Sequence, residues 1–121
     1  MPHPLAISLK TVSRVLTVRY DDNNEYELGC EYLRVYSPSA EVKGHGPGQS
    51  ILQTGKERVN IREIVPVGNY AVRLVFDDGH DSGIYTWDYL YQLGSRKQEL
   101  WTAYLQALVA AGHERKQDNG N

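Results

Sequence analysis

The chain repeats one pattern of residues, and this repeat limits the folds that it can adopt. Residues 18–28 (VRYDDNNEYEL) are followed by EYL at 31–33, and residues 74–85 (LVFDDGHDSGIY) are followed by DYL at 88–90. Each copy contains an alternating apolar stretch, a turn with two aspartates, a second strand and a helix-like segment. Two similar β-β-α units would allow a chain of 121 residues to close one core.

Strands are predicted wherever apolar and polar residues alternate along the chain. In RVLTVRY (14–20), Leu16, Val18 and Tyr20 fall on one side, and YAVRLVF (70–76) is the strongest strand pattern of all. Pro66 confines its strand to a sheet edge or a strand end, because proline has no N–H to donate. The other predicted strands are ISLK (7–10), EYEL (25–28), VNIREIVPVG (59–68) and SGIY (82–85).

Three helices are predicted after these strands. Two of them, GCEYLRVYS (29–37) and TWDYLYQLG (86–94), follow the two units, and Thr86 and Gly94 are the expected N-cap and end of the second. The last helix has capping-box spacing at its start and ends at Gly112. The capping box consists of Ser95 and Gln98, and the apolar stripe expected to cover one face of the sheet consists of Leu100, Tyr104, Leu105 and Leu108.

These elements predict an α+β fold in a single small domain, in which antiparallel β-hairpins pair into a sheet and pack with a C-terminal helix. The domain is expected to span residues 1–112, and the polar residues 113–121 are expected to form a disordered tail. Nine tyrosines and two tryptophans must supply much of the buried area, because there is a single phenylalanine. Their hydroxyl and indole groups need partners, so a core edged with hydrogen bonds is expected.

Charge and composition argue against several classes of protein. The formal net charge is −2 and no run of lysine and arginine occurs, so binding to a nucleic-acid backbone is not expected. No apolar stretch approaches the ~18 residues that span a bilayer, and the N-terminus lacks the regions of a signal peptide. We therefore expect no membrane contact and a cytoplasmic location. Cys30 is the single cysteine, which excludes an intrachain disulfide and favours a place in the core.

The residues capable of chemistry do not form a familiar motif. The histidines and the cysteine lack the spacings of common zinc sites, and no Gly-x-Ser-x-Gly motif accompanies a serine nucleophile. Residues 38–56 contain four glycines and two prolines, and a loop of this length is usually functional or mobile. Arg34 is a candidate for binding an acidic ligand or for pairing with a carboxylate of the protein.

Two segments carry a resemblance to a known family. LRVYSPSAEVKGHGPGQ (33–49) and GHDSGIYTWDYL (79–90) resemble the N-terminal domain of gamma-butyrobetaine hydroxylase and trimethyllysine hydroxylase, which are oxygenases dependent on iron and 2-oxoglutarate. The resemblance extends from about Pro4 to Gly112. Because the chain ends where the catalytic domain would begin, the resemblance implies that it is not itself a hydroxylase. Similar domains are also fused to P-loop ATPases of iron–sulfur cluster assembly.

The resemblance implies a position for a metal, but this sequence lacks most of the ligands at that position. In those hydroxylases the domain holds a structural zinc through a Cys-x-Cys-x-x-Cys loop and a distant histidine. The four positions fall here on Ser37, Ser39, Val42 and His80, so three of the four ligands are missing. Serine hydroxyls are poor zinc ligands at neutral pH and valine is none, so no cofactor is expected at this place.

Two hypotheses follow for His80. In the first, Ser37 is the N-cap of a helical turn in SPSAEV (37–42), hydrogen bonds replace the metal, and His80 lies beside this segment as a structural residue. In the second, His80, His45 and a carboxylate form a weak site for zinc or iron.

Three classes of function remain open. The first is a non-enzymatic accessory or protein-interaction domain, with a protein partner linked to iron or iron–sulfur protein maturation or to an oxygenase. The second is a small-ligand or metal-binding domain that uses His80 and the loop at residues 37–48. The third is an enzyme of unknown type. We favour the first, because no catalytic constellation is visible. The candidates for ligand or partner binding are Arg34, Ser37, Ser39, Glu41 and His45, with His80 as the candidate metal ligand.

Overall fold

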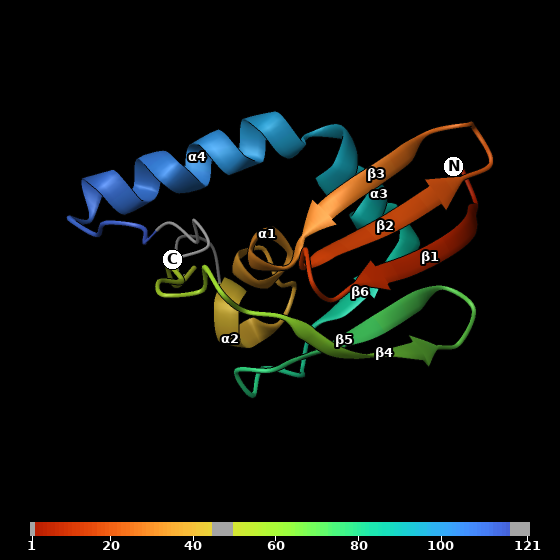
Figure 1. The fold of residues 1–121 in the computed structure, drawn as a ribbon, viewed down its shortest axis with the longest axis horizontal. Helices are drawn as coiled ribbons and strands as arrows, with labels where there is room; N and C mark the ends of the chain where they lie inside the picture. Colours follow the sequence, from red (N-terminus) through yellow and green to blue (C-terminus); the bar gives the residue numbers. More distant parts are fainter. Residues whose placement is uncertain (1, 45–49, 117–121) are drawn as a thin grey trace.

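Two three-stranded antiparallel sheets, each followed by a helix, make up most of the molecule. The computed structural model describes residues 2–44 and 50–116, and Figure 1 shows its fold. The strand orders are β1-β2-β3 and β4-β5-β6. The strands are β1 (Pro4–Lys10), β2 (Val15–Tyr20), β3 (Glu25–Gly29), β4 (Ile61–Val67), β5 (Ala71–Phe76) and β6 (Ile84–Thr86). The helices are α1 (Cys30–Val35), α2 (Ala40–Lys43), α3 (Trp87–Ser95) and α4 (Lys97–Ala110).

The predicted α+β class and the internal repeat are confirmed, with one more strand in each unit than the repeat itself indicated. Strands β1 to β3 lead into α1, and strands β4 to β6 lead into α3. The sequence suggested that the two hairpins pair into one sheet, and this prediction is wrong. They form separate sheets that contribute to one core. Among the strands of the described residues, β4 pairs with β5 alone and is therefore an edge strand, which accommodates Pro66 as expected.

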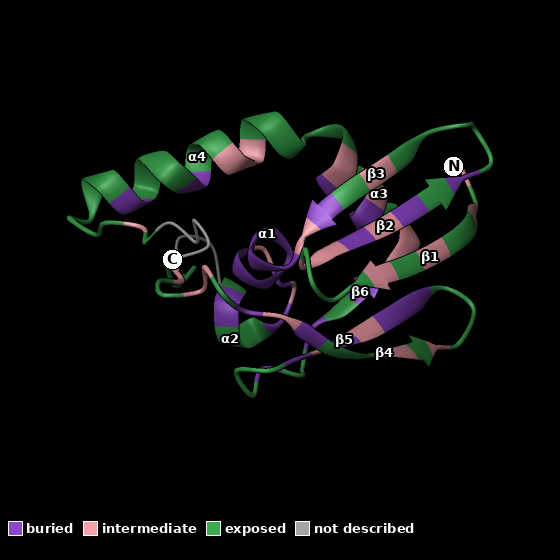
Figure 2. Ribbon diagram, viewed as in Figure 1, coloured by how far each residue is buried: buried purple, intermediate pink, exposed green. Residues whose placement is uncertain are grey.

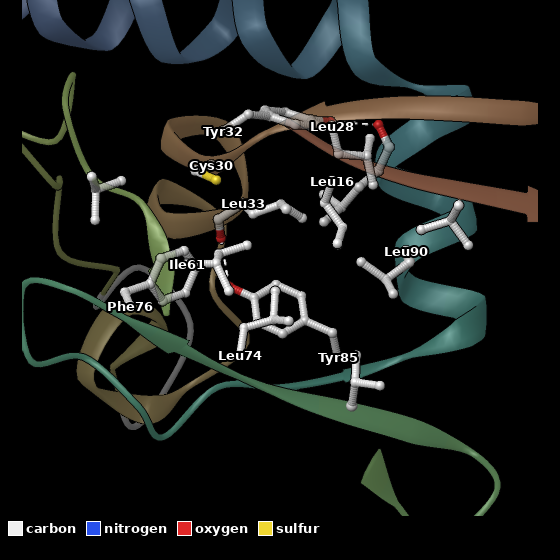
Figure 3. Close-up of a cluster of buried hydrophobic side chains, with 14 of the residues drawn as sticks. Leu16, Leu28, Cys30, Tyr32, Leu33, Ile61, Leu74, Phe76, Tyr85 and Leu90 are labelled. Atoms are coloured by element: carbon white, nitrogen blue, oxygen red, sulfur yellow. Dashed lines mark hydrogen bonds between the residues drawn. The ribbon is translucent and has the colours of Figure 1, made fainter. Parts of the chain in front are cut away.

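The core lies where the alternation of apolar residues placed it. Leu16, Val18 and Tyr20 of β2 are buried, and so are Leu74 and Phe76 of β5. Figure 3 shows side chains of both sheets meeting those of α1 and α3. Figure 2 shows that α1 is buried along its length and that buried residues are interspersed along the strands of both sheets.

The buried tyrosines edge the core with hydrogen bonds, as expected from their number. The hydroxyl of Tyr85 donates to the carbonyl oxygen of Leu33, and that of Tyr32 donates to the carbonyl oxygen of Leu93. Tyr20, Tyr36, Tyr89 and Tyr104 likewise donate to backbone carbonyls. Cys30 is 1% exposed, and burial raises the pKa of its thiol to about 11, in agreement with a core role.

Helix ends agree with the sequence in one case and differ in another. Thr86 caps α3 by accepting a hydrogen bond from the N–H of Tyr89 at 3.0 Å. The helix continues one residue past Gly94, whose lack of a side chain leaves room for the ring of Tyr26. The predicted capping box at the start of α4 is wrong, because the N-cap is Arg96 and the Ser95 hydroxyl donates to Gln92 instead.

Helix α4 lies beside α1 and does not lie over a sheet face as predicted. Tyr104 and Leu108 form a small second cluster with Val35 of α1, while Leu100 and Trp101 contact the edge of the main core. Leu105, assigned to the buried stripe, is 37% exposed. Figure 1 shows α4 passing beside α1, with its C-terminal half extending away from both sheets. The position next to β3 is taken by α3.

Residues 113–116, which the sequence assigned to a disordered tail, are held against the domain. The guanidinium of Arg115 donates to both carboxylate oxygens of Glu31 and lies 5.5 Å from the ring centre of Trp101. The backbone N–H of Lys116 donates to Glu57. Residues 117–121 lie outside the described residues. Within residues 2–44 and 50–116, no helix is both long and apolar enough to cross a membrane.

Candidate functional site

The segment between α1 and α2 meets the turn between β5 and β6, and this contact brings most of the candidate residues together. Ser39, not Ser37, is the N-cap of α2, because its hydroxyl accepts a hydrogen bond from the N–H of Glu41 at 3.2 Å. The predicted N-cap was therefore wrong by two residues. Ser37 is instead buried and directed at His80.

His80 is fixed by its own turn before it makes any contact with the other segment. Its N–H donates to Oδ1 of Asp78 at 3.2 Å, and its carbonyl oxygen accepts from the N–H of Phe76 at 2.9 Å. Gly79 precedes it with a φ of 92°, which a residue with a side chain adopts only with strain. His80 is 4% exposed overall, and its ring contacts that of Phe76.

The predicted proximity of His80 to residues 37–42 is confirmed. Nε2 lies 2.8 Å from Oγ of Ser37, and Nδ1 lies 3.1 Å from Oε2 of Glu41. A carboxylate can only accept, so Nδ1 carries a proton and donates to Glu41. In the neutral ring Nε2 then accepts from the Ser37 hydroxyl.

These bonds belong to a closed network, which we call the serine–histidine network: Ser37, Ser39, Glu41, His80 and Ser82. The Ser82 hydroxyl donates to Oε1 of Glu41 at 3.0 Å, and Ser39 therefore donates to Ser82 across 2.7 Å. The N–H of Ser39 donates to the Ser37 oxygen, which closes the ring. Hydrogen bonds from Ser82 and His80 hold the pKa of Glu41 below its usual value.

Arg34, a candidate for an acidic ligand, is engaged inside the protein. It is 7% exposed, its Nε donates to Oδ2 of Asp78 at 2.9 Å, and its Nη1 donates to the side chain of Gln53. Lys56 also pairs with Asp78, at 2.7 Å. Asp78 therefore joins two cations to the backbone of His80. Among the alternatives that the sequence left open for Arg34, pairing with a carboxylate of the protein is the one that the structure supports.

The carboxyl of Asp78 makes the free energy of unfolding depend on pH in the acid range. Burial by itself would raise the pKa of this carboxyl, but hydrogen bonds from Lys56, the His80 amide and Arg34 outweigh it and lower the pKa to about 2. A carboxyl whose pKa is lowered by folding stabilises the folded state at pH values above about 4, which is its pKa in the unfolded chain. This contribution is lost as the pH falls toward 2. We expect Asp78 to contribute about 2 kcal/mol at neutral pH.

Urea unfolding at a series of pH values between 5 and 2 would measure this contribution. Asp78→Asn should be less stable at neutral pH and should lose less stability on acidification than the wild type. Asp81→Asn is the matched control, because the side chain of Asp81 is 62% exposed and its nearest cationic atom, Nη1 of Arg73, is 3.8 Å away. Equal acid dependence in the wild type and Asp78→Asn would contradict the expectation.

The order Ser37–His80–Glu41 matches that of a serine hydrolase triad, a pairing that the sequence did not reveal. Ser37 and His80 are 43 residues apart, and neither lies in a motif that links them. The surroundings of Ser37 do not suit a nucleophile, however. The residue is 1% exposed, its oxygen accepts from the Ser39 amide, and Gly83 packs so closely that an added Cβ would collide with it. Among the described residues, the Ser37 oxygen is enclosed and is not presented to a substrate carbonyl.

The donor set at the implied metal position does not suit zinc. Two serine hydroxyls, a valine and one histidine stand there, and the histidine nitrogens are already hydrogen-bonded. Within the part of the chain that the structure describes, no group of three or more His, Cys, Asp or Glu side chains could hold a metal ion. His45 lies outside the described residues, so the site of His80, His45 and a carboxylate stays a prediction, as does the expected lack of a cofactor.

Comparison with known proteins identifies the family. Residues 7–91 match the family described as "Gamma-butyrobetaine hydroxylase-like, N-terminal", and the chain belongs to this family. The match is to an N-terminal domain and not to the catalytic domain of the hydroxylases. No curated protein matches the chain.

Solved structures show the same fold. Two proteins with NMR solution structures are 52% and 51% identical to this chain, with TM-scores of 0.81 and 0.82. The alignments cover 95% and 98% of this chain and 86% and 94% of the other chains. A crystal structure from Acidithiobacillus ferrooxidans is 43% identical with a TM-score of 0.65, over 76% of this chain and 92% of that one. It is described as a protein of unknown function in the DUF971 family.

Proposed function

We propose that this protein is a non-enzymatic accessory domain that binds a partner protein, and that α4 provides the binding surface. The observation that carries the proposal is the composition of this helix. Residues 100–112 (LWTAYLQALVAAG) contain no charged side chain, yet Tyr104 and Leu108 are the only buried residues among them. A surface helix that packs only within its own domain normally carries charged and polar residues on its outer face, and this part of α4 has only Thr102 and Gln106 as polar side chains.

The uncovered side of α4 has the features of an interface. Val109 is 77% exposed and Leu105 is 37% exposed. A recess of about 340 Å³ lies beside them, formed with Leu108 and the segment at 112–115. Figure 2 shows exposed residues along most of the length of α4. Burying such side chains on a partner stabilises a complex by about 25 cal/mol for each Å² of apolar surface removed from water.

The state of the polar candidates also supports an accessory role. Ser37, Ser39, Glu41 and His80 satisfy one another, and Arg34 is committed to Asp78. A group that performs chemistry must present its reacting atom to a substrate. The network connects α2 to the second sheet, so its evident physical effect is to hold the loop in place.

The finer proposal concerns the identity of the partner. We propose a protein of iron or iron–sulfur protein maturation, or an oxygenase. This proposal is supported by the proteins in which similar domains occur. They form the N-terminal domain of hydroxylases dependent on iron, and they are also fused to ATPases of iron–sulfur cluster assembly.

Quantitative affinity purification with matched baits would test both levels of the proposal. The baits are the wild type, the double variant Leu105→Glu with Val109→Glu, and Val12→Glu as a control, because Val12 is 96% exposed in the turn after β1. A true partner should be recovered by the wild type and by Val12→Glu and lost at least about tenfold with the double variant. A protein recovered equally by all three baits would refute binding through α4. A partner lost with the double variant but unrelated to iron would retain the interaction role and refute the finer proposal.

A further inference from the structure

A recess of about 480 Å³ opens between the start of α1 and the first turns of α4, away from the serine–histidine network. Its lining includes Tyr32, Trp101, Lys97, Arg115 and Glu31. Pockets for small molecules usually occupy about 300 to 1,000 Å³ and combine an apolar lining with a few polar groups. This recess has the same size and composition. It does not include Leu105 or Val109, on which the proposed partner surface depends.

Two aromatic rings form fixed walls of the recess. The hydroxyl of Tyr32 donates to the carbonyl oxygen of Leu93 at 2.6 Å, which holds the ring in one orientation. The ring of Trp101 meets that of Tyr32 edge to face, with centroids 6.2 Å apart, and lies 5.3 Å from the ring of Tyr104. Walls held in this way lose little entropy when a flat apolar group enters.

Within the described residues, the charges around the recess leave one cation without an acidic partner. Glu31 is matched by Arg115, whose guanidinium also lies over the ring of Trp101. Lys97 donates to the backbone carbonyl of Glu27 at 2.7 Å, an acceptor with no net charge. Among residues 2–44 and 50–116, no carboxylate forms a salt bridge with Lys97. The ammonium group keeps two further N–H donors for a ligand.

We propose that this recess binds a small carboxylic acid with a flat apolar body. The body would lie against Tyr32 and Trp101, and the carboxylate would accept hydrogen bonds from Lys97. Charge-assisted bonds of this kind are roughly twice as strong as bonds between neutral groups. A neutral or cationic analogue with the same body therefore binds more weakly. This ligand site goes beyond the proposed protein-binding role.

Titration followed by NMR would test the site directly, because the protein has two indole N–H signals. The Trp101 indole lines the recess, whereas that of Trp87 donates to the carbonyl oxygen of Asn69 on another part of the surface. The probes are 3-phenylpropionate, 3-phenylpropionamide and phenethylamine, each up to about 10 mM. We expect 3-phenylpropionate to move the Trp101 signal and not the Trp87 signal, with about tenfold weaker binding of the amide.

Reversing the charge of Lys97 distinguishes binding in the recess from non-specific adsorption. Lys97→Glu should lose binding of the acid and gain binding of phenethylamine, whereas Lys10→Glu, at an exposed lysine of β1, should bind as the wild type does. Lys97 is itself exposed, so this variant does not alter the core. The proposal is overturned if the Trp101 signal does not respond to the acid, or if acid and amine act equally on the wild type. These outcomes leave the partner test on Leu105 and Val109 unaffected.

Discussion

Replacing Ser37, Ser39 and Val42 by cysteine is expected to convert the serine–histidine network into a zinc site. Ser37 already lies within 2.8 Å of Nε2 of His80, and Ser39 and Val42 bracket the first turn of α2. Three thiolates and one imidazole are a common tetrahedral zinc donor set. A structural zinc contributes about 10 kcal/mol or more of apparent binding free energy, so the holo variant should unfold at a markedly higher temperature than its apo form.

Metal analysis and thermal unfolding of untagged protein would measure this gain. The triple variant should retain one zinc ion per chain after dialysis and lose its added stability with a chelator. Adding His80→Ala to the triple variant is the matched control, because it removes the fourth ligand and should weaken zinc binding strongly. Failure of the triple variant to bind zinc, or binding unaffected by His80→Ala, would show that the network does not occupy the metal position of the family.

Removing the guanidinium of Arg115 is expected to destabilise the domain by about 2 to 3 kcal/mol. The Glu31 side chain is 10% exposed, and without Arg115 its charge would be left almost buried and unpaired. Breaking a fully buried pair costs roughly 3 to 5 kcal/mol, and a smaller loss of about 2 to 3 kcal/mol is expected here because the Arg115 side chain is 30% exposed. The lost contact with Trp101 adds to the effect.

Urea unfolding of Arg115→Ala, Glu31→Gln and the double variant would test this expectation. Glu31→Gln removes the charge, so the double variant should be more stable than Arg115→Ala alone. Arg96→Ala is the control, because the Arg96–Glu99 pair is exposed on both sides and should contribute little. A stability of Arg115→Ala equal to that of the wild type would mean that residues 113–116 do not hold α4 to α1 in solution.

Strand faces and the fold class were predictable from the sequence because the alternation of residues in a strand encodes burial directly. Leu16, Val18 and Tyr20 were assigned to one side of β2 and are buried together. The Thr86 cap was also predictable, because a cap acts within one turn of its own helix. The capping box at Ser95 failed for a related reason. Its spacing is compatible with a capping box but does not fix where the preceding helix ends.

The sequence by itself determined a repeated β-rich unit, the inward faces of its strands and a histidine placed opposite residues 37–42 through a family resemblance. Only the tertiary structure decided that Ser37, Glu41 and Ser82 meet around that histidine, that α4 packs on α1, and that Arg115 pairs with Glu31. The physical reason is the separation along the chain between the residues that make contact. Local periods describe neighbours within a few residues, whereas contacts across 39 to 84 residues depend on how the finished sheets and helices pack.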